Sequence, residues 1–225
     1  DKSDILKNKD LLPGLLKTRT LGYDGKGQLI INNEKEIDKL ELNLKKEYVL
    51  EKKVNLKKEI SIIITRFSNN ECSIYEPVEN HHVDQILRKS FIPANVNKDT
   101  LKKAQQQAKL FAEKLNYIGT MCVEYFIDEN DNLLVNEIAP RVHNSGHLTI
   151  NAYNVSQFEN HIRAICNLKK VELKKIHNAE MINILGKEIA DYRKKSFNKS
   201  EFFFDYGKKE VKDKRKMGHL TILES

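Results

Sequence analysis

Between residues 136 and 147 the chain reads Asn136-Glu137-Ile138-Ala139-Pro140-Arg141-Val142-His143-Asn144-Ser145-Gly146-His147, and no other segment constrains the architecture as strongly. The segment begins at the end of an apolar run and continues into a loop that carries a cation, two imidazoles, an amide and a hydroxyl. Polar groups gathered in a loop at the end of a strand are typical of binding sites. Because arginine can hold an anionic oxygen through two donors, Arg141 and His143 predict a site for an anion.

Zinc is an alternative for this loop, because the spacing of His143 and His147 suits two ligands on one helix. Pro140, Ser145 and Gly146 argue against a helix, and neither a cysteine nor a further histidine stands nearby in the sequence. We therefore expect no zinc site here.

The run that leads into the loop is the second arm of an expected hairpin. The arms are 117–127 and 133–138, and the acidic turn 128–132 has residues that favour a chain reversal. Each arm carries a glutamate, Glu124 or Glu137, inside an apolar run, where an unpaired carboxylate is costly to bury. A magnesium ion held by both glutamates, with Asn136 as a further oxygen ligand, would compensate them. The alternative is that both glutamates face solvent from half-exposed strands.

Patterns on either side of this hairpin predict an α+β fold. Apolar positions recur at helical spacing in 99–115 and in 156–168, where Ser156 can cap the helix. Short apolar and β-branched runs predict strands, which are mostly antiparallel in the first part of the chain. The expected strands are 14–18, 28–32, 47–54, 59–67, 181–185 and 201–204, followed by a basic tail.

A glycine cluster, Gly22-Tyr23-Asp24-Gly25-Lys26-Gly27-Gln28, lies between two of these strands. Glycine lets backbone N–H groups approach a phosphate closely, and Lys17 and Lys26 add positive charge. An ordinary turn explains the cluster equally well, because Asp-Gly reverses a chain unaided. The spacing fits neither a Walker A loop nor a dinucleotide-binding fingerprint.

Composition limits the classes of partner. The 225 residues are 40% hydrophobic, which is enough for a core, and the net charge of +7 favours anionic partners. Six of the nine residues 208–216 are basic, which is by default a solvated charge run. Nucleic-acid binding is the sharper alternative, but no aromatic residues interleave with the run and tryptophan is absent, so we favour a local phosphate site.

The remaining signals are weaker. No apolar run is long enough to span a membrane and no signal peptide opens the chain, so we expect a cytoplasmic protein. The three cysteines, Cys72, Cys122 and Cys166, lack paired spacing and are interpreted as reduced and structural. Residues 75–82 predict a polar turn, in which His82 either meets a nucleotide or caps a strand end.

Taken together and in order, these segments resemble the N5-carboxyaminoimidazole ribonucleotide synthetases, a family within the ATP-grasp superfamily. The resemblance runs from about Gly14 to His219. The motifs that carry it are Leu16-Lys17-Thr18-Arg19, 22–28, Glu79-Asn80-His81-His82, 136–141, 143–147, Ser156-Gln157-Phe158-Glu159, Tyr206-Gly207-Lys208 and Arg215-Lys216-Met217-Gly218-His219.

The resemblance implies two α+β lobes that clasp ATP and a small β-rich C-terminal extension. It assigns residues 1–150 to the ATP-grasp lobes, and residues 151–225 to the rest of that region and a subdomain that covers the substrate. It also implies that the family's usual N-terminal domain is missing, so that the chain can hold the catalytic signature and be inactive alone.

The implied activity is that of an ATP-dependent carbon-nitrogen ligase of purine biosynthesis. ATP phosphorylates bicarbonate to carboxyphosphate, and the carboxyl group passes to the amine of 5-aminoimidazole ribonucleotide. The implied cofactors are ATP and Mg²⁺. The implied partners are the two small-molecule substrates, with neither nucleic acid nor membrane, and a homodimer is compatible with the resemblance.

Residue by residue, the resemblance implies the following roles. The ATP phosphates are held by Lys17, Gly22, Tyr23, Asp24, Gly25, Lys26, Gly27 and Gln28. Adenine and ribose are held by Glu51, Lys52, Lys53, Val54 and Glu59, with His82 also at the nucleotide. Magnesium is bound by Glu124 and Glu137, beside Asn136. The pocket for bicarbonate and carboxyphosphate is lined by Arg141, His143 and Asn144. Asp24 contacts the aminoimidazole, and Lys208 and Arg215 hold the ribonucleotide phosphate. The chain departs from the family pattern at Val142, where proline is usual.

Two rival interpretations remain. A formate-dependent glycinamide ribonucleotide transformylase would share the glycine loop and the carboxylates, and dependence on bicarbonate would separate the two activities. A noncatalytic fragment that binds nucleotide or nucleic acid would bind without releasing phosphate, or would bind any DNA or RNA in a salt-dependent way.

Overall fold

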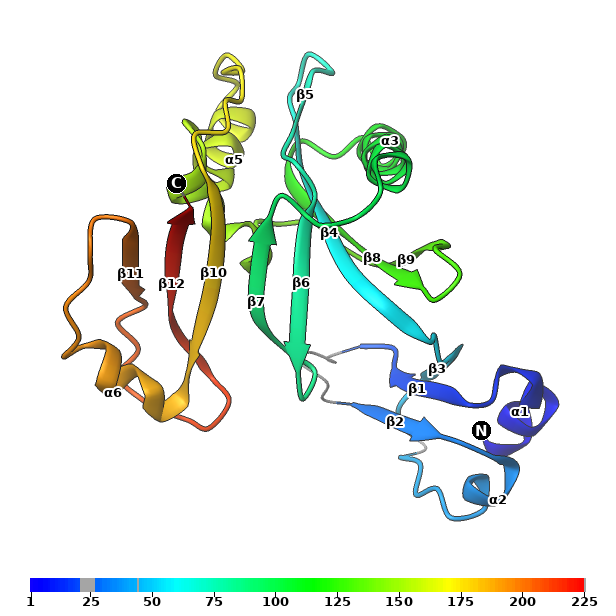
Figure 1. Ribbon diagram of the computed structural model, residues 1–225. Helices are drawn as coiled ribbons and strands as arrows, with labels where there is room; N and C mark the ends of the chain where they lie inside the picture. Colours follow the sequence, from blue (N-terminus) through cyan, green and yellow to red (C-terminus); the bar gives the residue numbers. More distant parts are fainter. Residues whose placement is uncertain (21–26, 44, 225) are drawn as a thin grey trace. The chain divides into compact units, whose positions relative to one another are not determined.

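The computed structural model describes residues 1–20, 27–43 and 45–224, and the chain forms two compact units. Unit 1 consists of Asp1–Asn55 and Asp84–Ile86, and unit 2 consists of Leu56–Val83 and Leu87–Ser225. Each unit has its own hydrophobic core. Both combine helices with antiparallel sheet, so the predicted α+β class is confirmed (Figure 1).

Unit 1 is built on a three-stranded antiparallel sheet in the order β2-β1-β3. Its strands lie within the predicted ranges: β1 is Gly14–Thr18, β2 is Gln28–Ile31 and β3 is Tyr48–Lys52. Its helices are α1 (Lys2–Lys7), the 3-10 helix η1 (Lys9–Leu11) and α2 (Glu34–Ile37). The core consists of Ile5, Leu16, Ile31 and Ile37, which are buried together.

Unit 2 contains a nine-stranded sheet in the order β11-β12-β10-β7-β6-β4-β8-β9, with β5 paired to β4. The strands are β4 (Leu56–Arg66), β5 (Cys72–Ile74), β6 (Val78–Val83), β7 (Ile86–Ile92), β8 (Gly119–Asp128), β9 (Leu133–Ala139), β10 (Asn178–Leu185), β11 (Glu201–Asp205) and β12 (Lys216–Glu224). Segments far apart in the sequence meet in it, because β4 pairs with β8 and β10 pairs with both β7 and β12.

The helices of unit 2 are α3 (Lys98–Lys114), η2 (Asn144–Leu148), α4 (Thr149–Ala152), α5 (Gln157–Ile165), η3 (Gly186–Glu188) and α6 (Ile189–Tyr192). The helix predicted from apolar spacing at 99–115 is α3, which lies beside β4 and β8 (Figure 1). Its buried alanines belong to the same core as residues of these two strands. Side chains alternate along β8, so that Val123 and Tyr125 face this core whereas Cys122 belongs to a second core.

Helix α5 differs from its sequence pattern in which side is buried. Ser156 caps it by accepting a hydrogen bond from Glu159 N, as expected. The apolar positions that predicted the helix are exposed, among them Ile162 and Ile165, each 53% exposed, whereas Gln157 is fully buried. The buried side of α5 therefore consists of two amides, Gln157 and Asn160, and the small Ala164.

Two strands replace segments that were expected to be irregular. The predicted polar turn at 75–82 contains most of β6, because the buried Glu79 and Asn80 find partners elsewhere in the sheet. The basic tail ends at β12, whose residues Met217 and Leu220 are buried. The turn prediction is wrong because polar residues can lie in a central strand when tertiary contacts satisfy them.

Candidate active site

The two glutamates of the predicted hairpin lie directly opposite each other. Glu124 on β8 pairs with Glu137 on β9, and the next pair is Tyr125 with Val135. Asn136 is therefore an extra residue without a partner, which makes a β-bulge beside Glu137. Bulges re-aim side chains next to active sites. The hairpin thus places the two glutamates opposite each other, as predicted, and Asn136 beside Glu137 in the chain.

Burial strongly perturbs Glu124. Its side chain is only 15% exposed. Burial, and then the negative charge of Glu137, raises the pKa of the Glu124 carboxyl to about 7. The solvent-facing alternative is therefore wrong for Glu124, although Glu137 is exposed. Two carboxylates and an amide are the hard oxygen donors that Mg²⁺ prefers, so this donor set fits a magnesium ion.

His143 lies against Glu124, with its Nε2 atom 3.2 Å from Glu124 Oε1. Its Nδ1 atom accepts a hydrogen bond from the Ser145 backbone N–H, which assigns the ring proton to Nε2. Burial, and then the positive charge of Arg141, lowers the pKa of His143 to about 3. The imidazole is therefore neutral at physiological pH and donates its proton towards the carboxylate.

Residues Asn144–Leu148 form the 3-10 helix η2, with His143 as its N-cap, although Pro140, Ser145 and Gly146 argue against a helix here. Gln157 of α5 fixes it, since Oε1 accepts from the His143 backbone N–H at 2.9 Å and Nε2 donates to the His143 carbonyl at 2.6 Å. Gly146 permits this approach, because a Cβ there would lie 2.6 Å from Gln157 Oε1. These two contacts across the sequence override the local preference.

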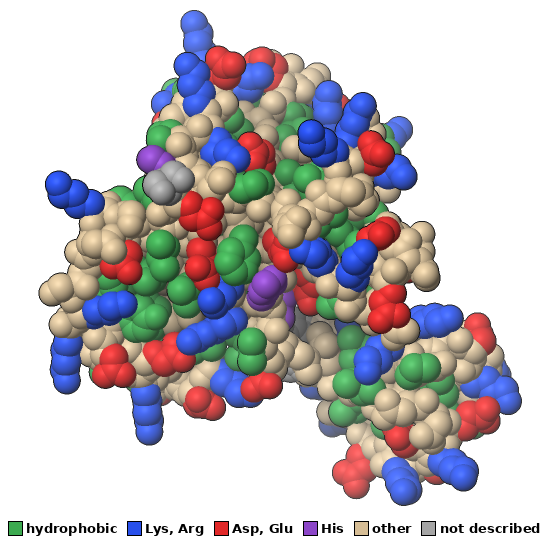
Figure 2. Space-filling model, viewed as in Figure 1, with side chains coloured by type: hydrophobic (Ala, Val, Ile, Leu, Met, Phe, Trp, Pro, Cys, Tyr) green, Lys and Arg blue, Asp and Glu red, His purple; other side chains and the backbone are tan. Residues whose placement is uncertain are grey.

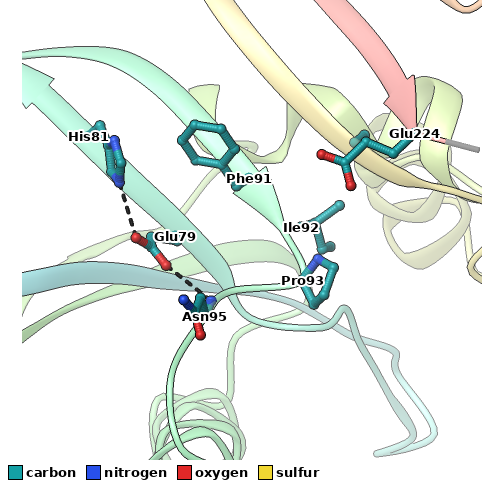
Figure 3. Close-up of a pocket in the computed structure, with 8 residues that line it drawn as sticks. Glu79, His81, Phe91, Ile92, Pro93, Asn95 and Glu224 are labelled. Atoms are coloured by element: carbon teal, nitrogen blue, oxygen red, sulfur yellow. Dashed lines mark hydrogen bonds and ion pairs between the residues drawn. The ribbon is translucent and has the colours of Figure 1, made fainter.

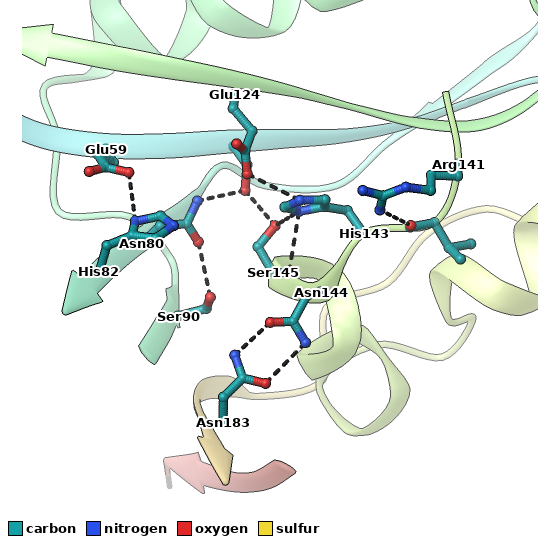
Figure 4. A network of polar contacts seen from close by, with 12 residues as sticks. Glu59, Asn80, His82, Ser90, Glu124, Arg141, His143, Asn144, Ser145 and Asn183 are labelled. Carbon is teal, nitrogen blue, oxygen red and sulfur yellow. Dashed lines mark hydrogen bonds and ion pairs between the residues drawn. The ribbon is translucent and has the colours of Figure 1, made fainter. Parts of the chain in front are cut away.

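A chain of buried polar side chains supports the site (Figure 4). Asn80 Nδ2 donates to Ser61 Oγ at 3.1 Å, and Ser61 Oγ lies 2.7 Å from Ser145 Oγ. Ser90 Oγ donates to Asn80 Oδ1 at 2.9 Å. Sequence reasoning did not assign roles to these residues. Asn80 and Ser145 stood in quoted motifs, whereas the only signal for Ser61 was a hydroxyl inside an isoleucine-rich strand.

Another predicted pair lies on β4 and β6. His82 Nδ1 is 2.6 Å from Glu59 Oε2, and both side chains are mostly buried. Neighbouring Glu79 is paired with Lys58 and His81 and lines a hollow of about 280 Å³ with Phe91, Ile92, Pro93, Asn95, Ala179 and Glu224 (Figure 3). This hollow contains none of the predicted site residues.

The ends of the basic run come together in the connection from β11 to β12. Lys208 Nζ donates to the Lys216 carbonyl at 2.6 Å and lies 5.2 Å from the centre of the Tyr206 ring. Burial, and then the charges of Arg215 and Lys216, lowers the pKa of Lys208. The three positive charges lie close enough to repel one another. An anion bound among them would relieve this repulsion.

Two hydrogen bonds to the amide of Asn183 fix Asn144. Its Nδ2 atom donates to Asn183 Oδ1 at 3.0 Å, and Asn183 Nδ2 donates back to Asn144 Oδ1 at 2.5 Å. Arg141 is exposed and donates to the carbonyl of Val142 at 3.0 Å (Figure 4).

The residues predicted to hold ATP in unit 1 are partly described. Lys17 on β1 forms an ion pair with Glu51 on β3, with 2.6 Å between Nζ and Oε2, and pairs with Gln28 in register. Lys52 and Lys53 are exposed and Val54 is half-buried. Gly27 has a φ of +80°. Gly22, Tyr23, Asp24, Gly25 and Lys26 lie outside the described residues.

Tertiary packing overturns one premise of the sequence reasoning about zinc. Cys122, Glu124 and His143 each offer a ligand atom, and these atoms all lie within 4.8 Å of one another. The rings of His147 and His219 are 5.2 Å apart. A cysteine and a further histidine are therefore near the loop in space, although they are distant in sequence.

Comparisons with known proteins show which family the chain matches. The profile of the ATP-grasp domain matches residues 4–158, and that of the phosphoribosylaminoimidazole carboxylase C-terminal domain matches residues 179–225. The chain is 45% identical over 231 residues to the N5-carboxyaminoimidazole ribonucleotide synthase of Staphylococcus aureus strain MRSA252, covering 99% of the chain and 60% of that protein. It is 41% identical over 215 residues to the synthase of Bacillus subtilis strain 168, covering 95% of the chain and 57% of that protein.

Solved structures give the same result. The S. aureus N5-carboxyaminoimidazole synthetase complexed with ADP superposes with a TM-score of 0.90 at 40% identity, covering 100% of the chain and 61% of that structure. The Aspergillus clavatus synthase in complex with ADP and 5-aminoimidazole ribonucleotide gives a TM-score of 0.89 at 28% identity, with the same coverage. The chain thus spans about 60% of the length of the relatives it matches. Among the described residues, no helix is both long enough and apolar enough to cross a membrane.

Proposed function

The chain belongs to the ATP-grasp domain family, and on this premise we propose that it carries the catalytic machinery of an N5-carboxyaminoimidazole ribonucleotide synthase. The proposed reaction uses ATP to convert bicarbonate into carboxyphosphate, and transfers the carboxyl group to the exocyclic amine of 5-aminoimidazole ribonucleotide. The products are N5-carboxyaminoimidazole ribonucleotide, ADP and phosphate. The observation that carries the proposal is the opposed pair of Glu124 and Glu137 beside a neutral His143.

The carboxylate pair is proposed to hold Mg²⁺ against the phosphates of ATP. Glu124 and Glu137 would supply two oxygen ligands and Asn136 a third, and the bulge at Asn136, directly before Glu137, supports this role. The ion would neutralise charge on the transferring phosphoryl group. A bound cation also explains why the chain tolerates a buried carboxylate next to another one.

Bicarbonate and carboxyphosphate are proposed to bind beside His143. Arg141 offers a guanidinium that can hold an anionic oxygen, and the exposed position of Arg141 leaves most of its donors available. The amide of Asn144 is held in place by Asn183. A site that keeps its donors in place stabilises developing charge and protects a labile intermediate from water.

Lys208 and Arg215 are proposed to hold the phosphate of the ribonucleotide. Their mutual repulsion supports this role, because a phosphate dianion between two cations would remove it. Asp24 is proposed to contact the aminoimidazole.

The ATP-binding roles are proposed on the resemblance. Lys17 and residues 22–28 would hold the phosphates, Glu51, Lys52, Lys53, Val54 and Glu59 would hold adenine and ribose, and His82 would also reach the nucleotide. Contact of His82 with Glu59 supports a shared role for these two. We further propose the division of roles between residues 1–150 and 151–225, a cytoplasmic location and a homodimer.

One observation bears on the nucleic-acid alternative. On the face drawn in Figure 2, lysine and arginine side chains are interspersed with aspartate and glutamate. Lys208 and Arg215 lie in the connection from β11 to β12, close enough for the charge of Arg215 to lower the pKa of Lys208. This distribution favours a small phosphorylated ligand over a long polyanion.

The test measures ADP formation from ATP in the presence of Mg²⁺, with and without bicarbonate and 5-aminoimidazole ribonucleotide. It uses the chain itself, and the chain joined to the part of the S. aureus relative that it does not cover. Turnover that requires both substrates establishes the proposed reaction. Turnover with formate and glycinamide ribonucleotide in their place would support the transformylase, and turnover indifferent to all of them would contradict both.

Glu137→Gln should abolish the Mg²⁺-dependent turnover. The matched control is Glu129→Gln, because Glu129 is an exposed carboxylate in the turn of the same hairpin. Equal activity of the two variants would show that Glu137 is not a ligand of the metal.

A further inference from the structure

A thiol lies beside the carboxylate of the proposed magnesium site. Cys122 and Glu124 are two residues apart on β8, so their side chains share one face of the sheet. His143 approaches the same face from the loop before η2. The ligand atoms of the three residues lie within 4.8 Å of one another, Cys122 is fully buried, and the side chains of Glu124 and His143 are 15% and 12% exposed.

This donor set differs from the one proposed for Mg²⁺. One sulfur, one imidazole nitrogen and one carboxylate oxygen suit Zn²⁺ and related transition metals, whereas Mg²⁺ prefers oxygen alone. Three protein ligands are also the number found in zinc sites that keep a fourth position open.

The surroundings of His143 provide a second, independent observation. Ligating histidines almost always donate their other ring N–H to a fixed acceptor. His143 Nδ1 lies 2.8 Å from Ser145 Oγ, which is fully buried and itself held by Ser61 Oγ at 2.7 Å. If the ring proton moves from Nε2 to Nδ1, Nδ1 gives up the hydrogen bond that it accepts from the Ser145 backbone N–H and donates to Ser145 Oγ instead, and Nε2 becomes free for a metal.

We propose that Cys122, Glu124 and His143 form a binding site for one thiophilic divalent cation of the Zn²⁺ class. Binding releases the thiol proton to solvent, and the imidazole keeps its proton on Nδ1. The site shares Glu124 with the proposed magnesium site, so the two cations exclude each other there. Resting on the proposed function, this overlap makes Zn²⁺ an inhibitor of turnover.

The binding test uses Co²⁺ as a spectroscopic probe of the untagged chain without nucleotide. Co²⁺ bound to a thiolate gives a near-ultraviolet charge-transfer band, and a tetrahedral site gives strong visible bands. We expect both at one Co²⁺ per chain, displaced by Zn²⁺ and not by an equal concentration of Mg²⁺. Absence of the charge-transfer band overturns the proposal.

Cysteine variants identify which thiol binds Co²⁺. Cys122→Ser should abolish the charge-transfer band, whereas Cys72→Ser and Cys166→Ser should keep it, since these thiols lie outside the cluster. Persistence of the band in Cys122→Ser overturns the site. Ser145→Ala retains every ligand and should weaken Co²⁺ binding by about 10- to 100-fold, the usual cost of losing an outer hydrogen bond. Unchanged affinity in Ser145→Ala also counts against the proposal, whether or not Cys122→Ser folds.

A second experiment, independent of Co²⁺ binding, measures inhibition of turnover by Zn²⁺. In the active protein, Zn²⁺ should inhibit ADP formation, and Cys122→Ser should be less sensitive. Failure of all turnover would contradict the proposed function and leave the Co²⁺ result standing. Turnover equally sensitive to Zn²⁺ in both proteins would overturn the shared site.

Discussion

At the scale of single residues, Glu124 connects stability with pH. Its native pKa of about 7 exceeds the ordinary value of 4.5, because burial and then the charges of Glu137 and Glu59 raise it by more than His82 and Lys216 lower it. A raised carboxyl pKa means that the native state binds the proton more tightly than the unfolded state does. The corresponding stability is fully present below about pH 4.5 and is lost as the pH rises through about 7.

Glu124→Gln should therefore stabilise the metal-free chain at about pH 8, by about 1–3 kcal/mol, and the gain should shrink towards pH 5. Thermal unfolding of both proteins across this range measures the effect, with Glu129→Gln as control. Addition of Mg²⁺ should stabilise the chain that keeps Glu124 and should not stabilise the Glu124→Gln variant. A gain that does not change with pH would show that Glu124 is not the titrating group.

Lys208→Ala should weaken binding of 5-aminoimidazole ribonucleotide by about 10- to 100-fold, as expected for a lost hydrogen bond between charged groups. ATP affinity should not change. Titration calorimetry measures both affinities, and Lys209→Ala is the matched control because Lys209 is exposed. If the variant loses ATP affinity instead, the phosphate assignment is wrong.

Residues whose type contrasts with the surrounding sequence were predictable. Glu124 and Glu137 stand out as charges inside apolar strands, and the structure does place them opposite each other. Cys122 and Ser61 gave no such signal, because their importance comes from contacts that join distant segments. Ser61 meets Ser145 across 84 residues of sequence, which no local pattern encodes.

At the scale of elements, α5 shows that a helix can bury its polar side. Gln157→Ala removes two hydrogen bonds to the His143 backbone, which leaves its N–H without a partner and its carbonyl with only the Gly146 N–H, so it should cost about 2 kcal/mol or more. Ile162→Ala removes an exposed side chain and should change stability by about 0.5 kcal/mol or less. Urea unfolding ranks the two variants, and the reverse order would contradict the orientation of α5.

The bulge in β9 permits a second test of an element. Deletion of Asn136 leaves the pairs Glu124–Glu137 and Tyr125–Val135 adjacent, so a regular ladder forms without a change of register. Far-UV circular dichroism should be unchanged. Mg²⁺ affinity should fall further than in Asn136→Ala, which keeps the bulge and removes only the amide. Equal losses would mean that the bulge does nothing beyond presenting Asn136.

Helices and strands with strong periodicity were predicted within a few residues, as α3 and β1 show. Strand β6 was not, because Glu79 and Asn80 look like turn residues until Lys58 and Ser61 are seen beside them. The side of α5 that is buried was equally hidden, since hydrophobic spacing identifies a helix and not the partner of each side.

At the scale of the whole molecule, the two units have separate cores, and no shift in composition revealed this division. Ile31→Ala empties part of the core of unit 1 and should destabilise that unit by about 2–5 kcal/mol. Hydrogen–deuterium exchange should then rise in β1, β2 and β3 and stay unchanged in β4 and β8. Faster exchange in all five strands would show that the units unfold together.

The pairing of β7 with β10 sets a condition on synthesis of the chain. Ile92 on β7 finds its partner Ala179 only after the intervening residues have been made. At about 5–20 residues per second, the edge of β7 stays open for roughly 4–17 seconds on the ribosome. An open strand edge can pair with another chain, so this interval is when the nascent protein is most prone to aggregate. Slowed elongation between residues 92 and 179 should therefore lower the soluble yield more than equal slowing after residue 185.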